Sequence, residues 1–231
     1  MQTLDRVKRE GEERLHPSLA NPSWLVLRKR REIFQKWLSE FAEQRLEVLD
    51  VGGRIQPYRP LLEGRLLRYV AVDLRRTLLV NVVARGEQLP HGDGQFDLVI
   101  CTQVLQYIPQ PQAVITEIYR VLKPGGRLLL SVPAACPRDA DEECWRFFPA
   151  ALRQLLQGFN EVEIVPEGGS IVGFFRTVNV CLNIFVRYRW LRSIFHRTLC
   201  PLINLLGAGL EDIAASANEQ FSPNYSARAR K

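Results

Sequence analysis

Two acidic residues, each at the end of a short apolar run, are the strongest chemical signal in the chain. Asp50 ends the run Val48-Leu49 and is followed by Gly52 and Gly53, and Asp73 ends a second run about 20 residues later. A buried parallel strand that stops at a ligand has this pattern. Glycines without Cβ atoms let backbone N–H groups approach a bound molecule, and a carboxylate at the Asp73 position accepts from two adjacent ribose hydroxyls.

Two other interpretations compete with this one. The glycines alone are equally compatible with an ordinary tight turn between a strand and a helix, and Asp73 with a surface residue that caps a turn. The GxGxxG pattern of dehydrogenases and the phosphate loop of nucleotide triphosphatases are both absent. The spacing therefore disfavours a cofactor with a diphosphate.

The remaining pattern places these residues in a sheet. Further strands are predicted at 68–73, 79–84, 96–101, 127–132 and 162–165, and helices at 59–67, 112–122 and 150–157. Strands that alternate with helices imply right-handed crossovers and a doubly wound, mainly parallel sheet. With residues 221–231 as a last strand at the sheet edge, the expected fold is α/β with a seven-stranded sheet.

The N-terminal part of the chain is predicted to add a helix outside the sheet. In residues 25–44, Phe34, Trp37, Leu38 and Phe41 fall on one helical face. The run 28–31 is basic and covers nearly a full turn, so a solvated face is preferred over contact with nucleic acid or lipid. Residues 1–20 are polar, and we expect at most two loosely attached helical turns there.

Residues 170–212 form a strongly apolar stretch with scattered arginines. Arg176, Asn179, Asn183 and Arg187 make a narrow polar stripe on a helix that buries most of its circumference. The uncharged runs 177–186 and 198–210 are shorter than the 18 to 20 residues, roughly, that a bilayer crossing needs. We expect a lid over the core, with weak docking on a membrane surface as the alternative.

Composition is that of an ordinary globular protein. The chain has 231 residues, 46% of them hydrophobic and 24% charged, and a formal net charge of +6. The five cysteines form no CxxC pair and have no histidine at zinc-site spacing, so reduced thiols and no metal site are predicted. The first 14 residues are charged throughout, unlike a cleavable signal, and a cytoplasmic location is expected.

Several motifs occur together in the order typical of one family. They are Val48–Gly53, Val72-Asp73, Glu87–Pro90, Gly94–Val99, Val104–Pro111, Glu117–Gly126 and Ser131–Pro133. As a set they resemble a class I S-adenosylmethionine-dependent methyltransferase of the type 11 group, strongly over 46–133 and more weakly through Cys144–Pro149. The motifs specify fold and cofactor and say almost nothing of the substrate.

The resemblance implies S-adenosylmethionine as the cofactor. It places the methionine part beside Asp50, Gly52 and Gly53, the ribose on Asp73, the adenine near Glu87 and Leu89, and the sulfonium beside Thr102 and Gln103. Two positions depart from the family: Arg54 replaces a second glycine, and Arg85 replaces an acid four residues before the Leu-Pro pair. Both departures weaken the site assignment more than the fold assignment.

A base is needed when the methyl acceptor is a hydroxyl or an ammonium that must lose a proton. The candidates are His91, Tyr107 and the acidic cluster Asp139, Asp141, Glu142 and Glu143. Each has an ordinary explanation, as an exposed loop residue, a packing residue or a solvated acidic loop. No catalytic residue is assigned.

The resulting hypothesis is a methyltransferase that acts on a small-molecule or glycan-like acceptor, with no nucleic-acid partner. One domain is expected over 1–231, made of a helical extension (1–45), a cofactor-binding core (46–169), a helical insertion (170–212) and a C-terminal strand (213–231). The alternatives are a non-catalytic cofactor-binding or scaffold protein, motivated by Arg54 and Arg85, and a peripheral membrane methyltransferase of lipid-linked acceptors. The oligomeric state is left open.

Overall fold

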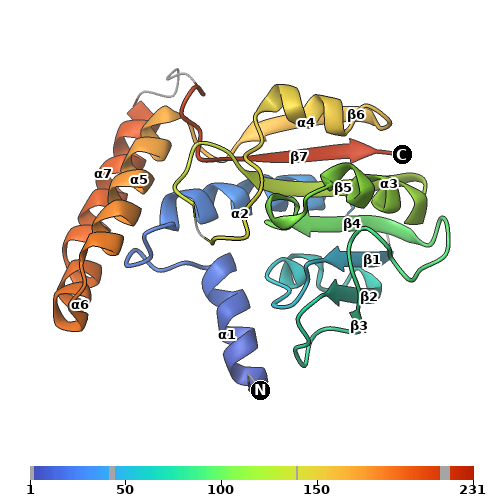
Figure 1. Ribbon diagram of the computed structural model, residues 1–231, viewed down its shortest axis with the longest axis horizontal. Coiled ribbons are helices and arrows are strands. Elements are labelled where there is room, and N and C mark those ends of the chain that lie inside the picture. The colour runs from blue at the N-terminus through green and yellow to red at the C-terminus, as the bar shows by residue number, and fades with distance from the viewer. Residues whose placement is uncertain (1–2, 42–44, 139, 214–218) are drawn as a thin grey trace.

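The computed structural model describes residues 3–41, 45–138, 140–213 and 219–231, and it is built on one seven-stranded sheet (Figure 1). The strands are β1 Leu46–Val51, β2 Leu66–Asp73, β3 Val82–Val83, β4 Phe96–Thr102, β5 Leu122–Pro133, β6 Asn160–Pro166 and β7 Asn224–Arg230. Their order is β3-β2-β1-β4-β5-β7-β6, with β1 to β5 parallel and β7 antiparallel to both neighbours. The predicted doubly wound α/β sheet is confirmed.

Helices cover both faces of the sheet because the strand side chains alternate between two apolar cores. Leu49, Val51 and Val99 point to the side of α3 (Pro111–Val121) and α4 (Pro149–Leu155), and Val48 and Leu98 point to the other side. On that second side, α2 (Trp24–Ser39) contributes the predicted face, with these side chains at most 5% exposed: Phe34, Trp37, Leu38 and Phe41. The 3.6-residue period of this segment therefore identified its buried face.

Three predicted elements differ in the structure. The expected helix over 59–67 is a single 3₁₀ turn at Arg59–Leu62, because Gly64 takes a left-handed φ of +78° and β2 begins at Leu66. The expected strand over 79–84 shrinks to β3. The last strand, β7, lies inside the sheet between β5 and β6 rather than at its edge.

The N-terminal segment is also more ordered than expected. Its helix α1 (Leu4–Leu15) has three turns rather than one or two, and it buries Val7, Gly11 and Leu15. A Cβ on Gly11 would lie 2.4 Å from the carbonyl oxygen of Ile55, so the helix packs directly on the loop after β1. Such a close backbone approach requires glycine.

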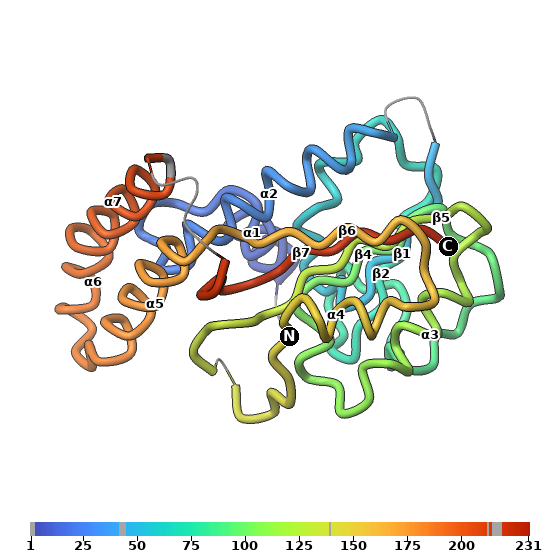
Figure 2. Tube along the Cα trace, turned by 90° about the horizontal axis from the view of Figure 1, so that it is seen from above, coloured from blue at the N-terminus to red at the C-terminus, as the bar shows by residue number. Residues whose placement is uncertain are grey.

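The segment predicted as a lid forms three helices, α5 (Ser170–Phe185), α6 (Arg189–Arg197) and α7 (Leu199–Ile213), which extend to one side of the sheet (Figures 1 and 2). The two asparagines of its predicted polar stripe lie between these helices: the amide of Asn179 donates to Asn204 at 2.9 Å, and Asn183 contacts His196 at 3.0 Å. Arg187 lies beyond α5 and is exposed, and α5 buries only Val172, Gly173 and Asn179, so the prediction that this helix buries most of its circumference was wrong. We call residues 170–213 the helical arm. Within the described residues, no helix is long and apolar enough to cross a membrane.

Candidate functional site

The carboxyl ends of β1, β2 and β4 meet at one edge of the sheet, and the turn after β1 is the tightest part of that edge. Gly52 has a left-handed φ of +81°, which side chains other than glycine rarely adopt. The N–H groups of Gly52 and Gly53 both donate to the carbonyl of Val72, at 2.8 and 3.2 Å. These N–H groups are therefore engaged within the protein, and contact of Gly52 and Gly53 with the cofactor stays a prediction.

Replacing Gly52 by alanine tests how strictly this turn needs glycine. The new Cβ would lie 2.2 Å from Cγ2 of Val104, in addition to the cost of the left-handed backbone. Gly64→Ala is a matched control, because Gly64 has a φ of +78° and a Cβ added there would have open space within 4 Å. We expect Gly52→Ala to lower the free energy of unfolding by about 1 kcal/mol more than Gly64→Ala, measured in urea. Equal losses would show that the contact with Val104 is relieved at no cost.

Asp50 is buried beneath this turn. Its side chain is 3% exposed, its Oδ2 accepts a hydrogen bond from the hydroxyl of Tyr69 at 2.6 Å, and a Cβ on Gly53 would lie 2.7 Å from its Cγ. Burial raises the pKa of Asp50 to about 7; the bond from Tyr69 opposes this shift, and the charge of Asp73 adds to it. Contact between Asp50 and a cofactor stays a prediction.

The raised pKa of Asp50 predicts a pH dependence of stability. Because the folded state holds this proton more tightly than the unfolded chain, its contribution to the free energy of unfolding falls as pH rises from about 4 to about 7. We expect Asp50→Asn to remove this slope, since an amide oxygen still accepts from Tyr69 and carries no charge. Urea unfolding at several pH values between these limits measures it. A wild-type slope that survives in Asp50→Asn would assign the titration to another group.

Asp73 ends β2 and is half-buried at the same edge. Its Oδ1 accepts the N–H of Arg75 at 2.7 Å, which caps the following turn, and its Oδ2 accepts no hydrogen bond from the described residues. Arg54, the first departure from the family pattern, has its Nη2 4.0 Å from Oε1 of Glu10 on α1. Asp73 thus both caps a turn and keeps one carboxylate oxygen free to accept.

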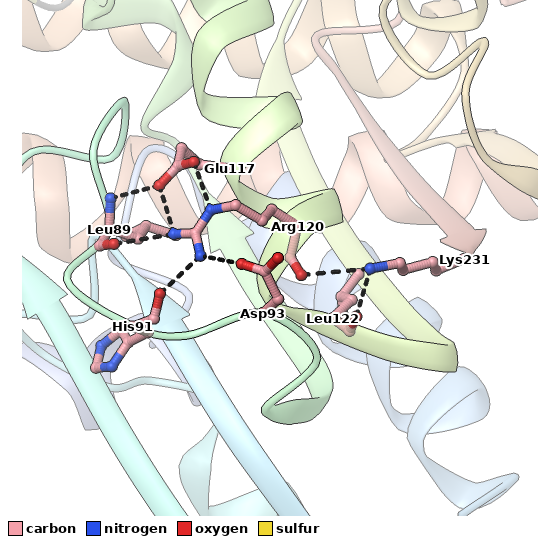
Figure 3. Close-up of polar contacts among 7 residues, drawn as sticks. All are labelled: Leu89, His91, Asp93, Glu117, Arg120, Leu122 and Lys231. Atoms are coloured by element: carbon pink, nitrogen blue, oxygen red, sulfur yellow. Dashed lines mark hydrogen bonds and ion pairs between the residues drawn. The ribbon is translucent and has the colours of Figure 1, made fainter.

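Leu89 lies in the loop between β3 and β4 and is held there by two side chains of α3 (Figure 3). Its N–H donates to Oε2 of Glu117 at 2.8 Å, and its carbonyl accepts from Nη2 of Arg120 at 3.0 Å. Arg120 lies beside Glu117 and lowers the pKa of that carboxyl. Leu89 is 4% exposed, whereas Glu87 is partly exposed and Arg85 lies at the surface. The motif of α3 therefore fixes the loop that carries the predicted adenine contacts.

Gln103 follows β4 in a strained conformation that the sequence did not indicate. Its φ is +57°, a left-handed value uncommon for a residue other than glycine. Its N–H donates to the carbonyl of Ser131 at 2.8 Å, and its Nε2 donates to Oγ of Ser131 at 3.1 Å. Strain of this kind is typical of functional sites and is maintained by such surrounding bonds. Thr102, the last residue of β4, is partly exposed beside it.

The buried ion pair of Arg30 and Glu167 is connected to Gln103 through Asn224. Glu167, fully buried after β6, accepts two bonds from Nε and Nη2 of Arg30, and one each from the hydroxyls of Ser131 and Ser226. With its amide oriented to satisfy its neighbours, Asn224 accepts from both Gln103 and Arg30, at 3.0 and 2.9 Å.

Sequence reasoning missed this network. Arg30 belongs to the basic run interpreted as solvated, yet it is 2% exposed, because a run that covers a helical turn must turn one member inward. Its neighbours Arg28 and Lys29 do pair with Glu32 on the outer face. The period of α2 would have placed Arg30 four residues before Phe34, on the buried side.

Among the candidate bases in the described residues, His91 lies away from this edge. His91 precedes β4 and packs against Phe96, the first residue of that strand, so it lies at the amino edge of the sheet. Its role as a base is therefore ruled out by position. In the acidic cluster, Asp141 pairs with Arg138 and Glu143 with Arg146, Glu142 is exposed, and Asp139 lies outside the described residues. Tyr107 follows the carboxyl end of β4 and stays a candidate.

Comparison with known proteins finds a family model that matches the core of the chain. A family model described as a methyltransferase domain, of the type 11 group, matches residues 49–130. Residues 49–130 are therefore similar to the class I S-adenosylmethionine-dependent methyltransferase domains of this group. The matched range contains Asp50, Gly52, Asp73, Leu89 and Gln103, so the methyltransferase domain coincides with the edge described above.

Curated relatives that match part of the chain are named as methyltransferases, and a solved structure has the same fold. A ubiquinone biosynthesis O-methyltransferase of Pseudomonas aeruginosa is 40% identical over 97 residues, which are 41% of this chain and 38% of that protein. A malonyl-[acyl-carrier protein] O-methyltransferase of Alcanivorax borkumensis is 36% identical over 114 residues, 43% of this chain and 39% of that protein. The chain thus spans about two fifths of the curated relatives it matches. An S-adenosylmethionine-dependent methyltransferase from Archaeoglobus fulgidus has the same fold, with a TM-score of 0.58 and 17% identity over 95% of this chain and 97% of that one.

S-Adenosylmethionine is the cofactor of this family, and the chemistry of the edge fits it. Asp73 has a carboxylate oxygen free to accept at the position predicted to hold a ribose, and Leu89 is buried in the loop that carries the predicted adenine contacts. Gln103 adds an amide that is fixed by Ser131. The individual cofactor contacts stay predictions.

Proposed function

We propose that the protein transfers the methyl group of S-adenosylmethionine to a small-molecule acceptor. The observation that supports this most is the match of the methyltransferase family to the residues that form the carboxyl edge, with Asp73 free to bind a ribose there. The two relatives named above are both O-methyltransferases, which favours an oxygen acceptor. A glycan-like acceptor is the finer form of the proposal, and it has no support from the relatives' names.

When bound, the cofactor supplies an electrophilic methyl carbon on a sulfonium. The protein's own part is orientation: Asp73 holds the sugar, and the α3 pair Glu117 and Arg120 keeps Leu89 in place. Gln103, fixed by Ser131 and supported by the Arg30–Glu167 pair, lines the sulfonium side. Holding two reactants in near-attack geometry removes a large part of such a barrier, so a catalytic base is not essential to the proposal.

A calorimetric titration with S-adenosylhomocysteine, followed by incubation of cell extract with labelled S-adenosylmethionine, tests the proposal. We expect saturable binding and a labelled small-molecule product. Failure of folded protein to bind S-adenosylhomocysteine would overturn the proposal. Binding without a labelled product in any extract would favour the alternative of a non-catalytic cofactor-binding protein, motivated by Arg54 and Arg85.

A further inference from the structure

The outer surface of the helical arm is apolar to a degree unusual for a surface exposed to water. Most of the large apolar side chains exposed in the described part of the chain lie on the arm. Its exposed members are Phe174, Ile184, Phe185, Tyr188, Trp190, Leu191, Ile194, Leu199, Leu202, Leu205, Leu206, Leu210 and Ile213. On α7 they recur every three or four residues, which makes one continuous stripe along the helix. Large exposed apolar surfaces of this kind mark interaction sites.

The charges of the arm have one sign along nearly its whole length. Between Ser170 and Leu210 the chain has no aspartate or glutamate, and four arginines in this range are exposed: Arg187, Arg189, Arg192 and Arg197. None of the four pairs with a carboxylate among the described residues. Three of them line a surface hollow together with His196 and Ala20. Guanidinium groups without a carboxylate partner around a hollow fit the phosphates of an anionic surface.

Apolar and cationic groups alternate most closely at the end of the arm. Phe185 is 77% exposed, Tyr188 67% and Trp190 63%, with arginines at 187, 189 and 192 between and beside them. On α6, Trp190 and Ile194 are one turn apart and exposed, while Phe195 is turned inward. Aromatic and basic residues in this arrangement are typical of helices that lie in the interface of a bilayer.

We propose that the helical arm docks on the surface of a bilayer that contains anionic lipid. The arginines would lie at the level of the headgroups, and the aromatic and leucine side chains would enter the boundary with the acyl chains. A second copy of the chain fits the arm less well, because a two-fold contact would bring the same unneutralised arginines together. Docking requires no spanning segment.

The position of the arm gives the docking a consequence for the site. The arm lies on the side toward which the parallel strands point (Figure 1), the side of Gly52, Asp73 and Gln103. A docked arm would therefore place the carboxyl edge of the sheet toward the lipid. Docking itself does not depend on methyl transfer, so the two proposals fail independently.

Co-sedimentation with vesicles tests the docking on the full chain without cofactor. We expect binding to phosphatidylcholine vesicles with about one third phosphatidylglycerol, weaker binding to phosphatidylcholine alone, and loss of the difference at high salt. Arg189→Gln/Arg192→Gln should weaken binding to the anionic vesicles about 25-fold, since each arginine near the surface contributes about fivefold. Trp190→Ser/Ile194→Ser should weaken binding to both kinds of vesicle at least about tenfold.

Matched controls separate docking from a general effect of charge or apolarity. Arg45→Gln/Arg153→Gln removes two exposed arginines outside the arm, and Leu67→Ser removes a leucine that is 64% exposed on β2. Both should bind like the wild type. The proposal is overturned if folded wild-type protein stays in the supernatant with anionic vesicles, or if the controls bind as weakly as the arm variants. A dimer in solution that Trp190→Ser/Ile194→Ser dissociates would also overturn it, because a second copy would then cover the arm.

Discussion

Asp73→Ala is expected to weaken the binding of S-adenosylhomocysteine by at least about 100-fold. A hydrogen bond to a charged group contributes about 1.5 to 3 kcal/mol, and a ribose would make two such bonds to this carboxylate. The variant should fold, because the side chain is only half-buried and loses a single bond within the protein, the one from the N–H of Arg75. Titration calorimetry of the wild type and the variant measures the ratio of dissociation constants.

Asp93→Ala is the control for this experiment. The side chain of Asp93 is 80% exposed and pairs with Arg120 in the loop before β4, at the opposite edge of the sheet (Figure 3). Its removal deletes a carboxylate of the same kind without touching the proposed ribose position, so binding should stay within about twofold of the wild type. If Asp73→Ala binds as tightly as Asp93→Ala, Asp73 serves only to cap its turn.

Glu167→Gln is expected to lower the free energy of unfolding by about 3 to 5 kcal/mol. The substitution leaves the guanidinium of Arg30 buried without a counter-charge, and removal of one partner from a buried pair costs this much. The whole domain has a stability on the order of 5 to 15 kcal/mol, so the loss is a large fraction of the total. Urea unfolding at neutral pH measures it.

The control for Glu167→Gln lies on the same helix as Arg30. Glu32→Gln removes the partner of Arg28 in an exposed pair, which is expected to change stability by at most about 0.5 kcal/mol. The Arg30→Met/Glu167→Gln double variant adds a further check, since it removes the buried charge as well as its partner. The comparison also needs the single variant Arg30→Met. If the double variant loses as much stability as Arg30→Met and Glu167→Gln together, the two side chains do not stabilise each other.

The parts of the fold that the sequence predicted are those set by local pattern. The buried face of α2 follows from the spacing of Phe34, Trp37 and Leu38, and the parallel core follows from strands that alternate with helices. The predicted place of β7 at the sheet edge was wrong because strand order depends on pairing between distant segments, which a run of residues does not encode. Gly64 ended the predicted helix early through its backbone conformation.

In the candidate site too, the residues that are close in the chain were predicted and those that meet from distant segments were not. Asp73 and the Gly52-Gly53 turn were found because the strand, the turn and the acid are close in the chain. The Arg30–Glu167 pair joins residues 137 positions apart. The sequence around either residue does not indicate that the other is its partner. His91 could have been removed from the candidate bases on sequence grounds, because it comes shortly before β4 and the start of a strand lies at the amino edge of a parallel sheet.

The antiparallel pairing of β6 with β7 has a consequence for how the helical arm could be replaced. Pro166 pairs with Tyr225, and the N–H of Glu167 donates to the carbonyl of Asn224 at 2.9 Å, so the chain leaves and rejoins the sheet at adjacent points. The helical arm is thus the loop of a β-hairpin, and loops of this kind exchange for others of different length at little entropic cost. Replacement of this one loop would leave the cofactor-binding edge unchanged and would change the surface on which the protein docks.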